Sequence, residues 1–129
     1  ADKRLLRHGA PELVTAAEAK LRGESVDPDV FARAVAALRG QPDGERIDTV
    51  VLACTHFPLI EDELRAAFGP GVSFIDGSDG IARRVAFLTE GQDWRRNQPD
   101  LALFTKGGDD VDQLGPTLVA NGLERVAIF

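Results

Sequence analysis

The residues best suited to chemistry are a thiol and an imidazole in the short run Cys54-Thr55-His56. A thiolate can act as a base or a nucleophile, and a histidine close by can orient it or exchange a proton with it. Cys54 is the only cysteine in the 129 residues, so it cannot form an internal disulfide, which fits a reducing cytoplasm. The simpler role for such a cysteine is that of a small buried hydrophobic residue.

The two residues after Cys54 each allow a structural and a functional interpretation. Thr55 is either a helix cap or, through its hydroxyl and backbone N–H at a helix entrance, a binder of carboxylate. His56 is a surface histidine, a metal ligand or a partner of the thiol. Because Cys54 and His56 supply two ligands and no second cysteine or paired histidine supplies the rest, we predict no metal site.

The flanking elements predict where these side chains lie. A strand is expected over 47–53, and its apolar run from Val50 to Ala53 predicts burial on both faces, while Pro58 suits the first turn of the helix that follows. In open α/β sheets, ligands bind in the crevice at the carboxyl ends of the strands. We therefore expect Cys54 in that crevice, where a helix amino end favours the thiolate.

The remaining pattern alternates helices and strands, which predicts an α/β fold with a parallel sheet flanked by helices on both sides. Asp76 and Ser78 are expected to form a turn and a helix cap. The expected helical faces are Val14, Ala17 and Leu21; Phe31, Val35 and Leu38; Ile60, Leu64, Ala67 and Phe68; and Ile81, Val85 and Leu88. Further strands are expected at 72–75, 101–105 and 125–129, and a further helix at 109–121.

The string from Cys54 to Leu59 closely resembles the second catalytic segment of the glutamate racemases, in the aspartate/glutamate racemase superfamily. The resemblance continues through 69–76 and 80–85, includes a weaker segment at 10–14 with Glu18, and fades after Gln98. Phe57 stands where tyrosine is common in the family and Ala53 where glycine is frequent, but neither departure changes a reacting group. Glutamate in place of His56 would have indicated the related aspartate racemases.

The resemblance implies a two-domain racemase fold and a specific chemistry. It implies interconversion of L- and D-glutamate for peptidoglycan synthesis, without cofactor or metal, by two cysteines that transfer the α-proton. In this chain it assigns Cys54 as one catalytic thiol, His56 as its tuning partner and a substrate binder, Thr55 as a substrate binder and Glu18 as support for His56. Helical glutamates are commonly solvated, which is the alternative for Glu18.

One thiol cannot stand on both faces of the α-carbon, so the single cysteine predicts an incomplete site. The chain is interpreted as the carboxyl-terminal half of a racemase, inactive without an amino-terminal half that carries the second cysteine. Residues 1–77 are expected to form the second α/β lobe, and 78–129 to complete the first. The family resemblance also implies a homodimer.

Charge and hydropathy exclude other classes of partner. The net charge of −6 argues against nucleic acid, whose binders carry a clustered basic excess. No apolar run approaches the ~18 residues of a membrane span, so no membrane partner is expected, and the lone cysteine favours a cytoplasmic protein. Two alternatives stay open: a noncatalytic binding module of the same fold with a vestigial or redox-reactive thiol, and a racemase for aspartate or another amino acid.

Overall fold

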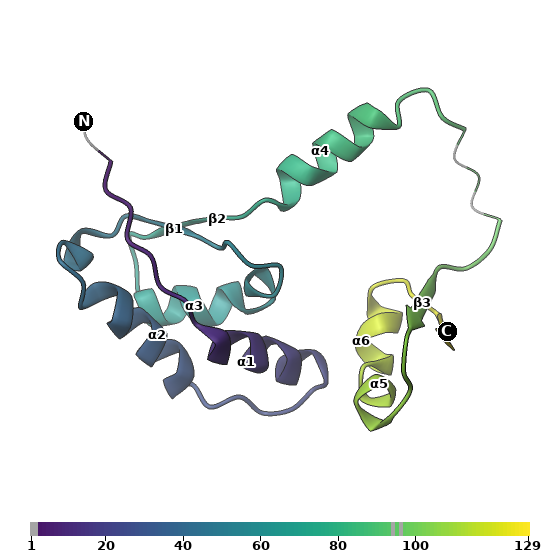
Figure 1. Ribbon diagram of the computed structural model, residues 1–129, viewed down its shortest axis with the longest axis horizontal. Helices are drawn as coiled ribbons and strands as arrows, with labels where there is room; N and C mark the ends of the chain where they lie inside the picture. The colour runs from purple at the N-terminus through teal and green to yellow at the C-terminus, as the bar shows by residue number, and fades with distance from the viewer. Residues whose placement is uncertain (1–2, 94, 96) are drawn as a thin grey trace.

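The computed structural model describes residues 3–93, 95 and 97–129 and contains two small parallel sheets, each with its own helices (Figure 1). We call residues 3–75 the first unit and residues 101–128 the second unit. The helices of the first unit are α1 (Pro11–Leu21), α2 (Asp29–Arg39) and α3 (Glu61–Phe68), with 3₁₀ turns η1 (Gly44–Arg46) and η2 (Phe57–Ile60). Its strands are β1 (Thr49–Val51) and β2 (Ser73–Ile75).

The second unit contains β3 (Leu101–Phe104), α5 (Asp109–Gln113), α6 (Gly115–Ala120) and β4 (Arg125–Ile128). Both sheets are parallel pairs, with Val50 opposite Phe74 in the first and Leu103 opposite Ala127 in the second. The expected α/β class with parallel strands and flanking helices is therefore confirmed. Between the units, α4 (Ser78–Leu88) extends away from β2, and its residues are exposed (Figure 1).

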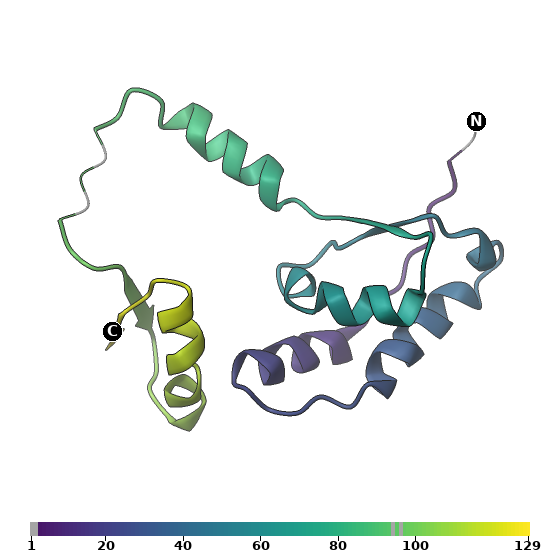
Figure 2. The same ribbon diagram turned by 180° about the vertical axis from the view of Figure 1, so that it is seen from behind.

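The core lies in the first unit, between one face of β1–β2 and the helices α1, α2 and α3 (Figure 2). The apolar faces expected for α2 and α3 are confirmed, because Phe31, Val35, Leu64 and Phe68 are buried. In α1 the buried stripe is rotated relative to the expectation: Leu13, Ala16 and Ala17 are buried, while Val14 is half-buried.

The expectation of a strand over 47–53 that is buried on both faces is wrong. The strand is limited to Thr49–Val51, and only Val50 points toward the core, whereas Val51 is 57% exposed on the opposite face. The sheet has two strands, and α1, α2 and α3 all lie on one side of it, so the described residues place no helix over the face that carries Val51 and Ile75.

Two helix boundaries also differ from the pattern. The helix expected over 109–121 is divided at Leu114 into α5 and α6, because Pro116, in the first turn of α6, has no amide to donate to the preceding turn and its ring crowds that turn. In α4 the helix begins at Ser78, where the side-chain Oδ1 of Asp76 accepts a hydrogen bond from the Ser78 amide at 2.7 Å. This confirms the turn expected at Asp76, although Ser78 is the first helical residue and not the cap.

The proposed lobe boundary near Gly77 coincides with the amino end of α4. The assignment of 1–77 and 78–129 to two different lobes stays a prediction. None of the helices in the described part of the chain combines the length and the apolar character that crossing a bilayer requires.

Candidate active site

Cys54 lies just beyond the carboxyl end of β1 and is half-buried. Leu52 continues the pairing of the strand, since its amide donates to the carbonyl of Ile75 at 2.9 Å, and its side chain is buried in the core. The chain then turns, and the amide of Phe57 donates to the carbonyl of Cys54 at 3.2 Å. The thiol therefore sits at the strand-to-helix turn, as its position in the sequence predicts.

Packing of η2 against α1 determines where His56 points. Ile60, at the end of η2, is fully buried, and it belongs to the same core cluster as Ala17 of α1. The small side chain at Ala17 leaves room for η2 to approach the helix. Phe57 packs against the same cluster, so the turn that carries His56 is held beside α1 at both of its ends.

Cys54, His56 and Glu18 form a row. The thiol Sγ of Cys54 lies 3.8 Å from Nδ1 of His56, and Nε2 of His56 lies 3.4 Å from Oε1 of Glu18 on α1. The His56 side chain is 33% exposed and that of Glu18 50%, so the row lies at the surface of this chain. The structure thus brings together the three residues that the sequence singled out as thiol, tuning partner and support.

The row has a clear chemical capacity. When the imidazole is neutral and its proton is on Nε2, which faces Glu18, Nδ1 presents a lone pair that can accept the proton of the Cys54 thiol. The imidazolium that results would then lie between a thiolate and the Glu18 carboxylate. The same three groups can return the proton, so the row suits a base that also serves as an acid.

Thr55 is exposed between the thiol and the imidazole. No side chain caps η2, whose N-terminal boundary residue is His56, so the capping role considered for Thr55 is not the one it has in this structure. Thr55 directly precedes the boundary residue of η2, so its exposed side chain lies at the amino end of that turn.

An ion pair near the site has no signal in the sequence pattern. Lys20 of α1 lies 2.7 Å from Glu63 of α3 and joins the two helices on either side of η2. Lysines and glutamates on helices are ordinarily solvated, so only the tertiary packing shows that these two residues meet.

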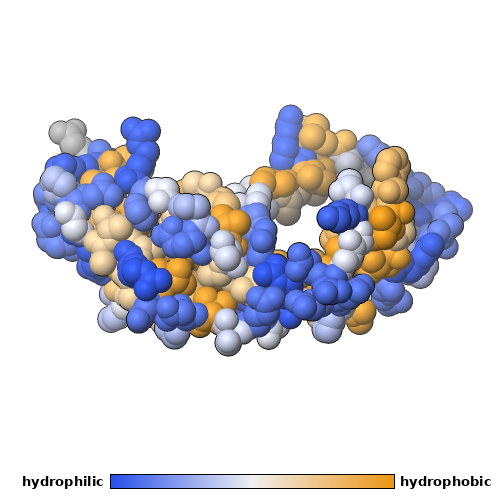
Figure 3. Space-filling view, turned by 60° about the horizontal axis from the view of Figure 1, so that its bottom comes forward, coloured by the Kyte–Doolittle hydropathy of each residue, from blue (hydrophilic) through white to orange (hydrophobic). Residues whose placement is uncertain are grey.

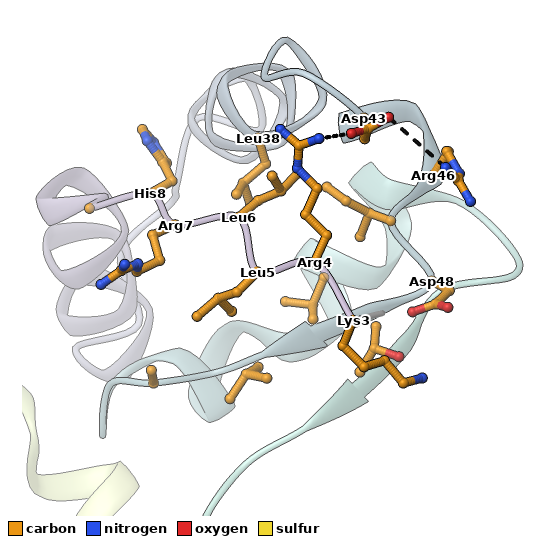
Figure 4. A pocket seen from close by; sticks show the side chains of 16 residues that line it. Lys3, Arg4, Leu5, Leu6, Arg7, His8, Leu38, Asp43, Arg46 and Asp48 are labelled. Carbon is orange, nitrogen blue, oxygen red and sulfur yellow. Dashed lines mark hydrogen bonds and ion pairs between the residues drawn. The ribbon is translucent and has the colours of Figure 1, made fainter. Parts of the chain in front are cut away.

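A pocket of about 820 Å³ lies between residues 3–9 and β1 (Figure 4). Asp43 is paired there with Arg4 and Arg46 (Figure 4). Ala53 lines the pocket but Cys54 does not, so this cavity is separate from the thiol. Within the described residues, no three His, Cys, Asp or Glu side chains gather in a group that could hold a metal ion.

Fold and site together define an α/β protein with a thiol, an imidazole and a carboxylate aligned at the carboxyl end of a parallel strand. No protein-family model matches the chain. The chain is 63% identical over 108 residues to glutamate racemase of Sphingopyxis alaskensis, a match that covers 83% of this chain and 40% of the relative. It is 39% identical over 120 residues to glutamate racemase of Salmonella typhimurium, covering 92% of this chain and 42% of the relative.

Solved structures agree with these sequence matches. The crystal structure of Escherichia coli glutamate racemase in complex with L-glutamate and an activator matches with a TM-score of 0.79 at 35% identity, over 92% of this chain and 44% of that one. A glutamate racemase isoform from Bacillus anthracis shares the fold, with a TM-score of 0.69 at 21% identity, over 95% of this chain and 45% of that one.

Over most of its length the chain is thus similar to part of proteins named glutamate racemase, which are isomerases. It spans about two-fifths of the length of the curated relatives it matches. The resemblance to the glutamate racemases that was noted at Cys54 to Leu59 is confirmed by these matches. The roles of the individual site residues stay predictions.

Proposed function

We propose that this chain supplies one of the two catalytic thiols of a cofactor-independent glutamate racemase. The observation that carries the proposal is the row Cys54–His56–Glu18 within a segment that is closely related to glutamate racemases. The substrate is glutamate, and the product D-glutamate serves peptidoglycan synthesis in the cytoplasm. Homodimerisation of the complete enzyme is part of the same proposal.

In the proposed reaction, Cys54 as thiolate removes the α-proton from one enantiomer of glutamate. The bond between that proton and Cα breaks, a bond to Sγ forms, and the electron pair remains on a planar carbanion stabilised through the substrate carboxylate. The second thiol, on the opposite face, then delivers its own proton to Cα. In the reverse direction Cys54 is the thiol that donates.

The neighbours of Cys54 have supporting roles in this proposal. His56 tunes the thiol and contacts the substrate, Glu18 holds His56 in orientation, and Thr55 binds the substrate carboxylate through its exposed hydroxyl. These roles are supported by the distances within the row and by the exposure of Thr55.

A second thiol must come from outside this chain, because the sequence contains one cysteine. We propose that the chain corresponds to the carboxyl-terminal part of the enzyme and is inactive alone. In this view residues 1–77 form the second lobe and 78–129 complete the first, where an amino-terminal half carries the other cysteine. The exposed apolar residues on β1, β2, β3 and β4 support a missing neighbour for both sheets.

The proposal is tested by exchange of the α-proton of D- and L-glutamate in deuterated water, followed by NMR. The chain alone is compared with a chimera in which it replaces the matching segment of the Sphingopyxis alaskensis enzyme. Exchange in the chimera and none in the chain alone is expected. A chimera that folds but catalyses no exchange would favour a noncatalytic module, and exchange of aspartate in preference to glutamate would favour the related racemase.

A further inference from the structure

A side chain of the second unit closes the end of the helix that carries Glu18. The hydroxyl of Thr117, on α6, donates to the carbonyl oxygen of Leu21 at 2.6 Å, and the bond is partly buried. Leu21 is the last residue of α1, so its carbonyl has no partner within the helix. Thr117 therefore satisfies an acceptor that the first unit leaves open.

Charge at the same helix end supports the contact. Arg22 follows Leu21, and the pKa of its guanidinium is held above its ordinary value, first by a hydrogen bond with Glu24 and further by the negative charges of Asp110 and Glu18. Asp110 lies in the acidic first turn of α5, directly before α6. Opposite charges thus face each other where the two units meet.

Little else in the described residues joins the units. The hydrophobic core cluster consists of first-unit residues, and the space-filling view shows an opening through the molecule (Figure 3). A contact without a shared apolar core depends on its directional bonds. The relative orientation of the units is then sensitive to the Thr117 hydroxyl.

We propose that Thr117 is a positioning residue, which docks the second unit on the carboxyl end of α1 and so sets how that unit is oriented relative to the Cys54 site. Glu18 lies on the last turn of the same helix, so the docking point and the support for His56 share one rigid element. The consequence for catalysis rests on the proposed function, in which the second unit completes the lobe across the cleft. The docking of the second unit on α1 is independent of that function.

The docking is tested by interspin distances in the full chain. Cys54→Ser removes the native thiol, and spin labels are placed on cysteines introduced at two exposed positions, Arg33 of α2 and Asp112 of α5. Thr117→Val removes the hydroxyl with nearly the same shape, and Thr117→Ala removes it by a second change. Thr117→Ser retains it, and Thr15→Val is the matched control at an exposed position of α1.

The undocked population is expected to rise about fivefold in Thr117→Val and Thr117→Ala, the change that loss of one ordinary hydrogen bond produces. Thr117→Ser and Thr15→Val should keep the parent distance distribution. An unchanged distribution in both hydroxyl-free variants, or an equal change in Thr117→Ser, would overturn the proposal.

A second readout separates this proposal from the proposed function. In the chimera, Thr117→Val is expected to raise KM for glutamate several-fold, with recovery in Thr117→Ser. A chimera that is inactive with every side chain in place would count against the proposed function, whereas the distance measurement on the chain would still decide whether Thr117 docks the second unit.

Discussion

His56 and Glu18 meet across two elements, with Nε2 of the imidazole 3.4 Å from Oε1 of the carboxylate. On its other side, His56 faces the Cys54 thiol at 3.8 Å. The imidazole therefore lies between the carboxylate and the thiol that it could deprotonate. The effect of each neighbour on the reactivity of Cys54 can be measured in the chain itself.

Glu18→Gln is expected to slow the alkylation of Cys54 by iodoacetamide near neutral pH. The amide keeps the size of the side chain but removes the charge, so a fall of about twofold to fivefold is expected, the size that corresponds to a half-exposed ion pair worth up to ~1 kcal/mol. His56→Asn should slow the reaction further. Glu12→Gln, at an exposed position of the same helix, is the matched control, and an equal fall in that variant would contradict a specific role for Glu18.

Cys54→Ser is expected to abolish racemisation in the Sphingopyxis alaskensis chimera. A serine hydroxyl is far less acidic than a thiol, so loss of the general base should lower the exchange rate of glutamate by at least about 100-fold. The fold should be retained because the side chain is half-buried and nearly unchanged in size, which circular dichroism would show. Persistent exchange in this variant would remove Cys54 from the mechanism.

Ile60→Ala should lower the free energy of unfolding, because Ile60 packs the turn that carries His56 against α1. Ile60 is fully buried where η2 packs on α1, and truncation of a buried isoleucine costs about 2–5 kcal/mol of the free energy of unfolding. Urea denaturation followed by circular dichroism measures the loss. Leu59→Ala is the control, since Leu59 is 40% exposed and should cost less than about 1 kcal/mol. Similar losses in the two variants would contradict the packing described here.

Part of this structure could be predicted from residue patterns because the information was local. Phe31 and Val35 on α2, and Leu64 and Phe68 on α3, recur at helical spacing and are all buried. The Cys54–Thr55–His56 string is contiguous, so its place after a strand followed from its neighbours. Glu18 was found only through the family resemblance, since its contact with His56 depends on how η2 packs against α1.

The remaining errors have tertiary causes. Val51 has a side chain suited to burial, but burial on two faces requires elements on both sides of the sheet, and the described residues cover one. The division between α5 and α6 was also missed, although Pro116 was a local signal for it. Thr117 and Leu21 illustrate a third case, because a hydrogen bond between two distant helix ends has no sequence pattern.

The ion pair of Arg22 and Glu24 gives a prediction about pH. The hydrogen bond from Arg22 lowers the pKa of the Glu24 carboxyl below its ordinary value of 4.5. A lowered carboxyl pKa contributes stability above the unfolded value, and that contribution is lost as pH falls through the folded value. An NMR titration of the Glu24 side-chain carbon should therefore have its midpoint below 4.5. Arg22→Ala should move the midpoint upward, and an unchanged midpoint would exclude the pairing.

The exposed apolar face of the first sheet should cause the isolated chain to bind hydrophobic dyes and to self-associate. Val51 and Ile75 are 57% and 52% exposed on adjacent parallel strands, and the exposed Leu5 lines the same pocket as Val51. Such a patch binds hydrophobic dyes and promotes association. The double variant Val51→Thr, Ile75→Thr keeps β-branched side chains suited to strands and should bind less dye and remain monomeric at higher concentration. Thr49→Ser, on the same face, is the control. If dye binding is unchanged in the double variant, the dye binds elsewhere, on α4 or the second unit, and the proposed amino-terminal half would then have to cover those elements.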